Sequence, residues 1–161
     1  MKRCILFSLI AIIGLSACES IDDERIPPSA VHIEFSNVGI WNTYGVAAAP
    51  DYRTFIKSKG IPADFPYTSL SYTGFGGILL VSDLNNTPVA FDLACPVERK
   101  NDVRITVDKE NLVAKCPKCG STYDIYELGG YPLSGEAAER KYGLQQYPVT
   151  PNSLGGYTIS H

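Results

Sequence analysis

Three cysteines lie in two short loops, each of which follows a strand-like segment. The first loop reads Cys95-Pro96-Val97-Glu98, and the second reads Cys116-Pro117-Lys118-Cys119-Gly120. A C-x-x-C turn places two thiolates on one side of a tight loop, and two such loops that face each other form a tetrahedral metal pocket. The second loop has both cysteines, whereas Glu98 stands at the position of the second cysteine in the first loop.

Four chemistries are open to these side chains. Zinc accepts three thiolates and one carboxylate in a tetrahedron, so the three cysteines and Glu98 could form a mononuclear site. The same four residues could hold an iron–sulfur cluster with an altered ligand set. A disulfide between Cys95 and one of the other two would suit an oxidising compartment. The fourth is a thiol redox pair of Cys116 and Cys119, although a strand-like segment follows it where thioredoxin-type pairs open a helix.

The elements that must position these loops are short strands. Alternating or continuous apolar segments, separated by glycine and proline turns, cover residues 31–35, 77–81, 88–93, 103–107, 112–115, 122–126, 145–149 and 156–160. Helical periodicity is rare, and only residues 51–59 and 137–142 are predicted as short helices. Many short strands with turn signals between them predict an all-β sandwich or barrel.

Around the cysteine loops, over about residues 76–150, the chain resembles the cluster-binding half of Rieske [2Fe–2S] proteins. The family pattern is C-x-H, a hairpin, C-x-x-H-G, an aromatic–Asp pair, a glycine turn and a Y-x-V strand. The matching strings here are Cys95-Pro96, Cys116 to Gly120, Tyr123-Asp124, Gly129-Gly130 and Tyr147-Pro148-Val149. The resemblance implies a Rieske-like antiparallel β sandwich or barrel, with a small two-hairpin, rubredoxin-like subdomain at about residues 93–133.

The chain departs from the family at the ligands. A Rieske centre has two cysteines on one iron and two histidines on the other. Val97 stands at the position of the first histidine and cannot bind a metal, and Cys119 stands at the position of the second. The chain has two histidines, His32 and His161, and both lie outside the motif. The resemblance therefore predicts the fold more directly than the usual Rieske cofactor.

Residues 1–17 have the features of a signal peptide. Lys2 and Arg3 are followed by a short apolar segment over residues 5–15, which is shorter than a bilayer span requires. The string Leu15-Ser16-Ala17-Cys18 resembles the lipobox of bacterial lipoproteins, and similar cysteine strings occur in small Rieske-like lipoproteins of Bacteroidetes-like bacteria. We expect cleavage before Cys18, acylation of its thiol and anchoring in the cell envelope, on the periplasmic face or the cell surface.

The remaining chain has the size and composition of one domain. Of the 161 residues, 45% are hydrophobic, which favours a globular domain over a disordered chain. We expect an acidic, proline-containing tether at residues 18–30 and the Rieske-like domain at residues 31–161. The net charge of −3 argues against nucleic acid as a partner, because phosphate binding requires a basic surface.

Other residue groups suggest catalysis or ligand binding less strongly. The glycine-rich residues 74–77 precede a strand, whereas a phosphate loop follows one, so a turn or bulge is predicted. Trp41, Tyr72 and Phe75 could line a cleft, but core packing is the favoured interpretation. Two histidines are too few to indicate a Ser/His/Asp triad, and we find no acid, base and nucleophile set of an enzyme.

These observations predict a membrane-anchored accessory protein that binds a metal ion or an iron–sulfur cluster. With iron it would carry electrons, and a protein partner would approach the tip formed by the cysteine loops. The alternative is a structural or interaction lipoprotein with a degenerate Rieske fold, stabilised by zinc or a disulfide, or without a cofactor.

Overall fold

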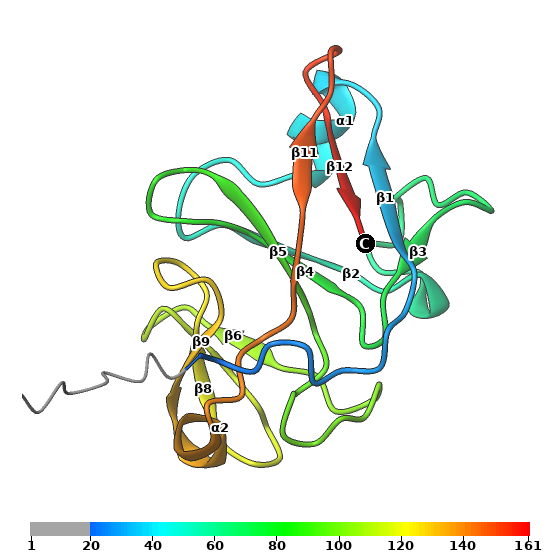
Figure 1. The fold of residues 1–161 in the computed structure, drawn as a ribbon. Coiled ribbons are helices and arrows are strands. Elements are labelled where there is room, and N and C mark those ends of the chain that lie inside the picture. The colour runs from blue at the N-terminus through cyan, green and yellow to red at the C-terminus, as the bar shows by residue number, and fades with distance from the viewer. Residues whose placement is uncertain (1–19) are drawn as a thin grey trace, which may run out of the picture.

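The computed structural model describes residues 20–161 and consists of three four-stranded antiparallel sheets (Figure 1). The first sheet has the order β11 (Val149–Pro151), β12 (Tyr157–Ser160), β1 (Val31–Phe35), β3 (Tyr72–Thr73). The second has the order β10 (Gln146–Tyr147), β5 (Pro88–Asp92), β4 (Ile78–Ser82), β2 (Tyr52–Phe55). The third has the order β6 (Thr106–Asp108), β7 (Val113–Lys115), β8 (Thr122–Asp124), β9 (Tyr131–Ser134). The all-β prediction is confirmed.

Strand β4 is buried on both faces and separates two hydrophobic cores. Successive side chains of a strand point to opposite faces. Ile78 and Leu80 belong to the first core, which the strands of the first and second sheets share. Leu79 and Val81 belong to the second core, which joins the second sheet to the third. This arrangement explains why the segment is continuously apolar rather than alternating.

The third sheet forms the small subdomain, and its two hairpins β6–β7 and β8–β9 confirm the two-hairpin prediction. It lies at the lower left of Figure 1, beside α2 (Gly135–Arg140). A bridge between Ala94 and Arg104 connects the subdomain to the end of β5. The second core extends from Phe91 of β5 to Tyr123 of β8, so the cysteine loops are packed against the main sheets.

The predicted helix at residues 51–59 is wrong. Residues Tyr52–Phe55 form β2, which pairs with β4 along its whole length, and only Lys57–Lys59 form one 3₁₀ turn, η1. Strand pairing places the Phe55 ring in the first core, where it is fully buried, and this burial outweighs a weak local helical pattern. The helix at 137–142 is confirmed as α2 with slightly different ends.

One short helix, α1 (Val38–Tyr44), was not predicted from the sequence. Its N-cap is Asn37, whose side-chain oxygen accepts hydrogen bonds from the backbone N–H groups of Gly39 (2.9 Å) and Ile40 (3.1 Å). No helix within residues 20–161 combines the length and apolarity that a bilayer span requires.

The described part of the expected tether is bound to the domain. The backbone of Asp22 exchanges hydrogen bonds with Lys141 and Gly143 (2.9 Å each), and Ile26 is 3% exposed. The Arg25 guanidinium lies 3.7 Å from the centre of the Tyr142 ring. Acidic and proline content predicted a solvated spacer, whereas these contacts hold the segment, blue in Figure 1, against the residues that follow α2. The Arg99 Nε also donates to the Arg25 carbonyl (2.9 Å), which ties the segment to the first cysteine loop. The predicted signal peptide, Cys4 and Cys18 lie outside the described residues.

A buried carboxylate organises the glycine loop that precedes β4. Asp92 is 0% exposed and accepts hydrogen bonds from the backbone N–H groups of Phe75 (2.9 Å), Gly76 (2.9 Å) and Ala94 (2.7 Å). The Tyr147 hydroxyl also donates to it at 2.7 Å. These four donors compensate the loss of hydration that burial imposes on the carboxylate.

We predict that Asp92→Asn destabilises the protein by about 1–3 kcal/mol, the cost of leaving buried hydrogen-bonding groups unsatisfied. The side-chain NH₂ group of the introduced asparagine would face the backbone N–H groups that now donate to Asp92, so donors would face donors. Urea denaturation measures the effect, and Asp64→Asn at an exposed position is the matched control.

The loss of unfolding free energy caused by Asp92→Asn should also depend on pH. Burial raises the pKa of Asp92 above its ordinary value of 3.8, although its hydrogen-bond donors oppose the shift. Because the pKa of Asp92 is higher in the folded state than in the unfolded state, the folded state binds the proton more tightly. The free energy of unfolding that Asp92 contributes therefore falls as the pH rises from the ordinary pKa of 3.8 to the folded-state pKa. The difference in unfolding free energy between wild type and variant should narrow over that interval. A difference that widens with pH would contradict this assignment.

Candidate metal centre

The structure brings three of the four predicted ligands together. The sulfurs of Cys95, Cys116 and Cys119 all lie within 4.8 Å of one another, and those of Cys95 and Cys119 are 3.6 Å apart. All three are free thiols in this structure, since a disulfide requires sulfurs about 2.05 Å apart. Metal–sulfur bonds of about 2.3 Å in a tetrahedron place sulfurs about 3.8 Å apart. The observed spacing therefore suits three ligands of a single metal ion.

Each cysteine loop is held by its own backbone hydrogen bonds. The N–H of Cys95 donates to the Val103 carbonyl (3.0 Å), which fixes the first loop to the subdomain. In the second loop the N–H of Cys116 donates to the Ser121 carbonyl (2.9 Å), and the N–H of Gly120 donates to the Cys116 carbonyl (3.1 Å). Gly120 has a φ of +75°, a left-handed conformation that glycine adopts without strain.

Backbone N–H groups are directed at two of the sulfurs. Those of Val97 and Glu98 donate to the Cys95 sulfur, and that of Ser121 donates to the Cys119 sulfur. A donor on sulfur favours the thiolate over the thiol, and the thiolate is the form that binds metals. The turns therefore supply both the spacing and the polar surroundings of a metal-thiolate site.

Two hydroxyl groups add to these surroundings. The Tyr123 oxygen lies 3.6 Å from the Cys95 sulfur, and the Ser121 oxygen lies 3.3 Å from the Cys119 sulfur. Burial, and then the charge of Cys95, raise the pKa of Tyr123, so its phenol stays protonated and can donate to a thiolate. The Ser121 oxygen accepts from the Cys119 thiol and from the N–H of Ala137 in α2 (3.2 Å). Once Cys119 is ionised, the Ser121 hydroxyl can donate to the thiolate.

The cysteines differ in accessibility and ionisation. Cys95 and Cys116 are 0% exposed, whereas Cys119 is partly exposed. Burial raises the pKa of Cys95 to about 12, so a bound metal must displace its proton. Burial also acts to raise the pKa of Cys119, but hydrogen bonds with Ser121 and the other two cysteines lower it overall. Cys119 therefore ionises more readily than Cys95, and it is the most exposed of the three cysteines.

Glu98 is not part of the sulfur cluster. Its carboxylate lies 2.5 Å from the ammonium of Lys118, and this hydrogen bond raises the pKa of Lys118. The pair connects the first cysteine loop to the second, and in this structure the Glu98 carboxylate lies with Lys118 rather than with the three sulfurs. The sequence analysis did not assign a role to Lys118, although its place between Cys116 and Cys119 was a signal that it shares the face of the loops.

The histidine ligands of a usual Rieske centre are absent from the cluster. Val97, at the first histidine position, packs against the second core. His32 lies in β1 of the first sheet, and the His161 ring lies 5.4 Å from that of Tyr147. The residues present do not fit a centre with two cysteine and two histidine ligands.

No family model matches the sequence, and no curated protein matches it. Solved structures that align with the chain include those of the quaternary ammonium Rieske monooxygenase CntA. The CntA structure with an inhibitor aligns with a TM-score of 0.48 and 16% sequence identity. The CntA structure with L-carnitine aligns with a TM-score of 0.46 and 15% sequence identity. Each alignment covers 81% of this chain and 31% of the other, so the chain spans about a third of their length.

The geometry predicts which substitutions abolish metal binding. Serine in place of Cys95, Cys116 or Cys119 should reduce bound metal to less than about a tenth, because each removes one of three thiolate ligands. Glu98→Gln should leave the metal content unchanged, because this carboxylate is paired with Lys118. Metal per chain after dialysis against a weak chelator is the measurement. Loss of metal in Glu98→Gln would instead make the carboxylate the fourth ligand.

Proposed function

We propose that the protein is an accessory metal-binding protein with a Rieske-like domain, anchored in the bacterial cell envelope. The observation that carries the proposal is the convergence of three cysteine sulfurs within 4.8 Å, two of them fully buried. A cluster of thiols with backbone N–H donors on its sulfurs is suited to a thiophilic ion.

Three protein ligands leave one position of a tetrahedral ion for water or another outside ligand. Residues 20–161 offer no fourth histidine, cysteine or acidic ligand atom within the cluster. Zinc in this site would stabilise the subdomain, and iron would give it the capacity to carry an electron. In either case Tyr123 and Ser121 hold the sulfurs of Cys95 and Cys119 through hydrogen bonds.

The hydroxyl groups favour a redox role over a purely structural one. Hydrogen bonds to ligand sulfurs stabilise the more negative, reduced state and so raise the reduction potential of an iron site. Cys119 is partly exposed, and its neighbours Lys118 and Gly120 are exposed, so a partner could approach the metal from this side. We propose electron transfer as the role of the iron-bound form, and a structural or interaction role as the alternative.

The membrane anchor is a separate part of the proposal and depends on the lipobox-like string before Cys18. The backbone of Asp22 is bound to Lys141 and Gly143, and the Arg25 carbonyl accepts from Arg99, which follows the first cysteine loop. Three residues lie between Cys18 and Asp22. The four residue steps from Cys18 to Asp22 span at most about 14 Å in an extended chain. An acylated Cys18 would therefore hold the cysteine subdomain near the membrane surface.

The metal content of the full-length chain, purified anaerobically in detergent from a bacterial host, tests the metal proposal. We predict about one metal ion per chain and no disulfide among the three cysteines, because their sulfurs share a single ion. Elemental analysis, a visible spectrum and a thiol count after metal removal are recorded together.

The outcomes separate the alternatives. Iron with visible thiolate-to-iron bands supports electron transfer, and zinc in a colourless protein supports the structural role. Two irons with inorganic sulfide would show a cluster with an altered ligand set. Absence of metal together with one free thiol of three would contradict the proposal and indicate a disulfide-stabilised module.

The anchor is tested by Cys18→Ser, with Cys4→Ser as the matched control. We predict that Cys18→Ser moves the protein from the membrane fraction to the soluble fraction, because the acylated thiol is lost. Cys4→Ser should stay in the membrane fraction. Equal membrane association of both variants, or no incorporation of labelled fatty acid into the wild type, would contradict the anchor.

A further inference from the structure

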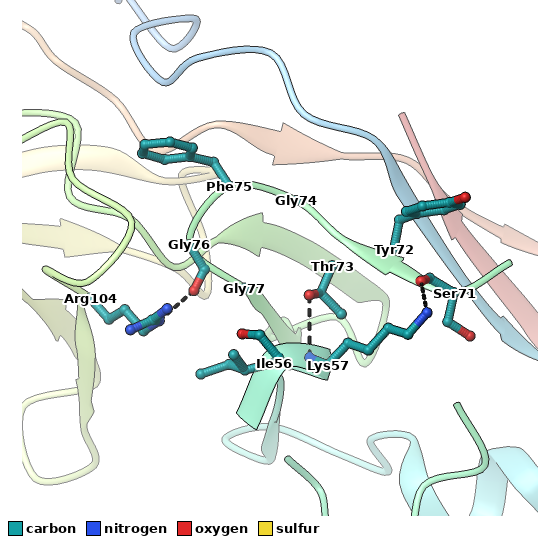
Figure 2. A pocket seen from close by; sticks show the side chains of 11 residues that line it. Ile56, Lys57, Ser71, Tyr72, Thr73, Gly74, Phe75, Gly76, Gly77 and Arg104 are labelled. Atoms are coloured by element: carbon teal, nitrogen blue, oxygen red, sulfur yellow. Dashed lines mark hydrogen bonds between the residues drawn. The ribbon is translucent and has the colours of Figure 1, made fainter. Parts of the chain in front are cut away.

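A hollow of about 460 Å³ lies beside the glycine loop at residues 74–77, within the size range of small-molecule sites (Figure 2). Its walls come from the 3₁₀ turn η1, from β3 and from the glycine loop, and Arg104 closes the end nearest the cysteine subdomain. The proposed metal site does not include any of these residues.

Two cations line this hollow without an acidic partner. The Lys57 ammonium donates to the carbonyls of Thr68 (2.7 Å) and Ser71 (2.8 Å), and the Arg104 Nε donates to the carbonyl of Gly76. Neither side chain takes part in any ion pair found within residues 20–161. Figure 2 shows Arg104 at the Gly76 end and the Lys57 ammonium at the Ser71 end.

Both cations retain unused hydrogen-bond donors. An ammonium has three N–H groups and Lys57 uses two, while the two terminal nitrogens of Arg104 make none of the protein hydrogen bonds found. The protein as a whole is acidic, with a net charge of −3. Two cations in one hollow that form no ion pair within residues 20–161 favour an anionic ligand there.

Three of the four N–H groups of the glycine loop are already engaged within the protein. The N–H groups of Phe75 and Gly76 donate to the buried carboxylate of Asp92, and that of Gly74 donates to the Ala30 carbonyl (3.1 Å). A phosphate loop would direct these groups at its ligand. The charged side chains of Lys57 and Arg104 are therefore the main groups that could recognise an anion here.

Apolar groups complete the hollow. Tyr72 is 48% exposed and Phe75 is partly exposed, and Ile56 lies between the two cations in Figure 2. The sequence analysis favoured core packing for both aromatic residues, whereas the structure places them at the hollow. An aromatic or other apolar ring could pack against these side chains while its charged group reaches a cation.

We propose that this hollow is a binding site for a small organic anion, in which a carboxylate or phosphate group is joined to an apolar ring. Arg104 offers a planar pair of donors that matches either group, and Lys57 offers a point charge at the other end. The site goes beyond the proposed metal function and does not require it. It adjoins the metal site, because Arg104 is bridged to Ala94, the residue before Cys95.

The test is a titration of the full-length protein with phenyl phosphate, followed by the amide NMR shifts of residues 74–77. We expect saturable shifts with a dissociation constant of about 1 mM, the affinity that small ligands of this size reach. Lys57→Gln and Arg104→Gln should each weaken binding about tenfold, the value of one hydrogen bond to a charged group. Lys59→Gln, an exposed neighbour with the same charge change, should have no effect.

Additional ligands and variants make the test selective. Phenol, which lacks the charge, should bind at least about tenfold more weakly, and benzoate in a parallel titration tells whether phosphate or carboxylate is preferred. Arg104→Lys keeps the charge and should retain more binding than Arg104→Gln, which separates recognition from a folding defect. Three results would overturn the proposal. They are equal amide shifts with phenol, unchanged binding in both glutamine variants, and no shifts at about 10 mM phenyl phosphate, which is ten times the expected dissociation constant.

Discussion

Two loops that are separated by a hairpin in the sequence must be held face to face, and the second core imposes this constraint. Cys95 comes three residues after β5, and Cys116 directly follows β7. Both are nevertheless fully buried in the same cluster of apolar side chains. That core also contains Leu79 and Val81 from the central strand β4. The spacing of the sulfurs therefore depends on the packing between the main sheets and the small subdomain, and not on the loops alone.

Local sequence patterns predicted much of this arrangement, because they act over short distances. Period-two alternation and turn residues identified most strands. The proline-containing cysteine strings identified the two loops whose sulfurs converge. The pairing of Glu98 with Lys118 depends on how two loops meet, which spacing within each loop does not determine. The same reason applies to β2, where pairing with β4 replaced a predicted helix. Asp92 was also overlooked, since a single acidic residue at the end of an apolar strand does not show that loop N–H groups will surround it.

The two proposed sites meet at one junction in the fold. Asp92 fixes the glycine loop, the glycine loop forms one wall of the hollow, and Arg104 at the end of that hollow is bridged to Ala94, next to Cys95. The polypeptide between β5 and β6 thus contributes residues to both proposed sites. A ligand in the hollow would contact the residues that support the first cysteine loop, and it would not need to reach the metal itself.

The central claim is that one ion is bound by three cysteine sulfurs and no carboxylate of this chain. X-ray absorption spectroscopy at the zinc edge, on full-length protein loaded with one equivalent of zinc, tests it most directly. The account predicts three sulfur neighbours at about 2.3 Å and one oxygen or nitrogen neighbour at about 2.0 Å, with the same spectrum in Glu98→Gln. A shell with two sulfurs or fewer, or a spectrum that changes in Glu98→Gln, would contradict it.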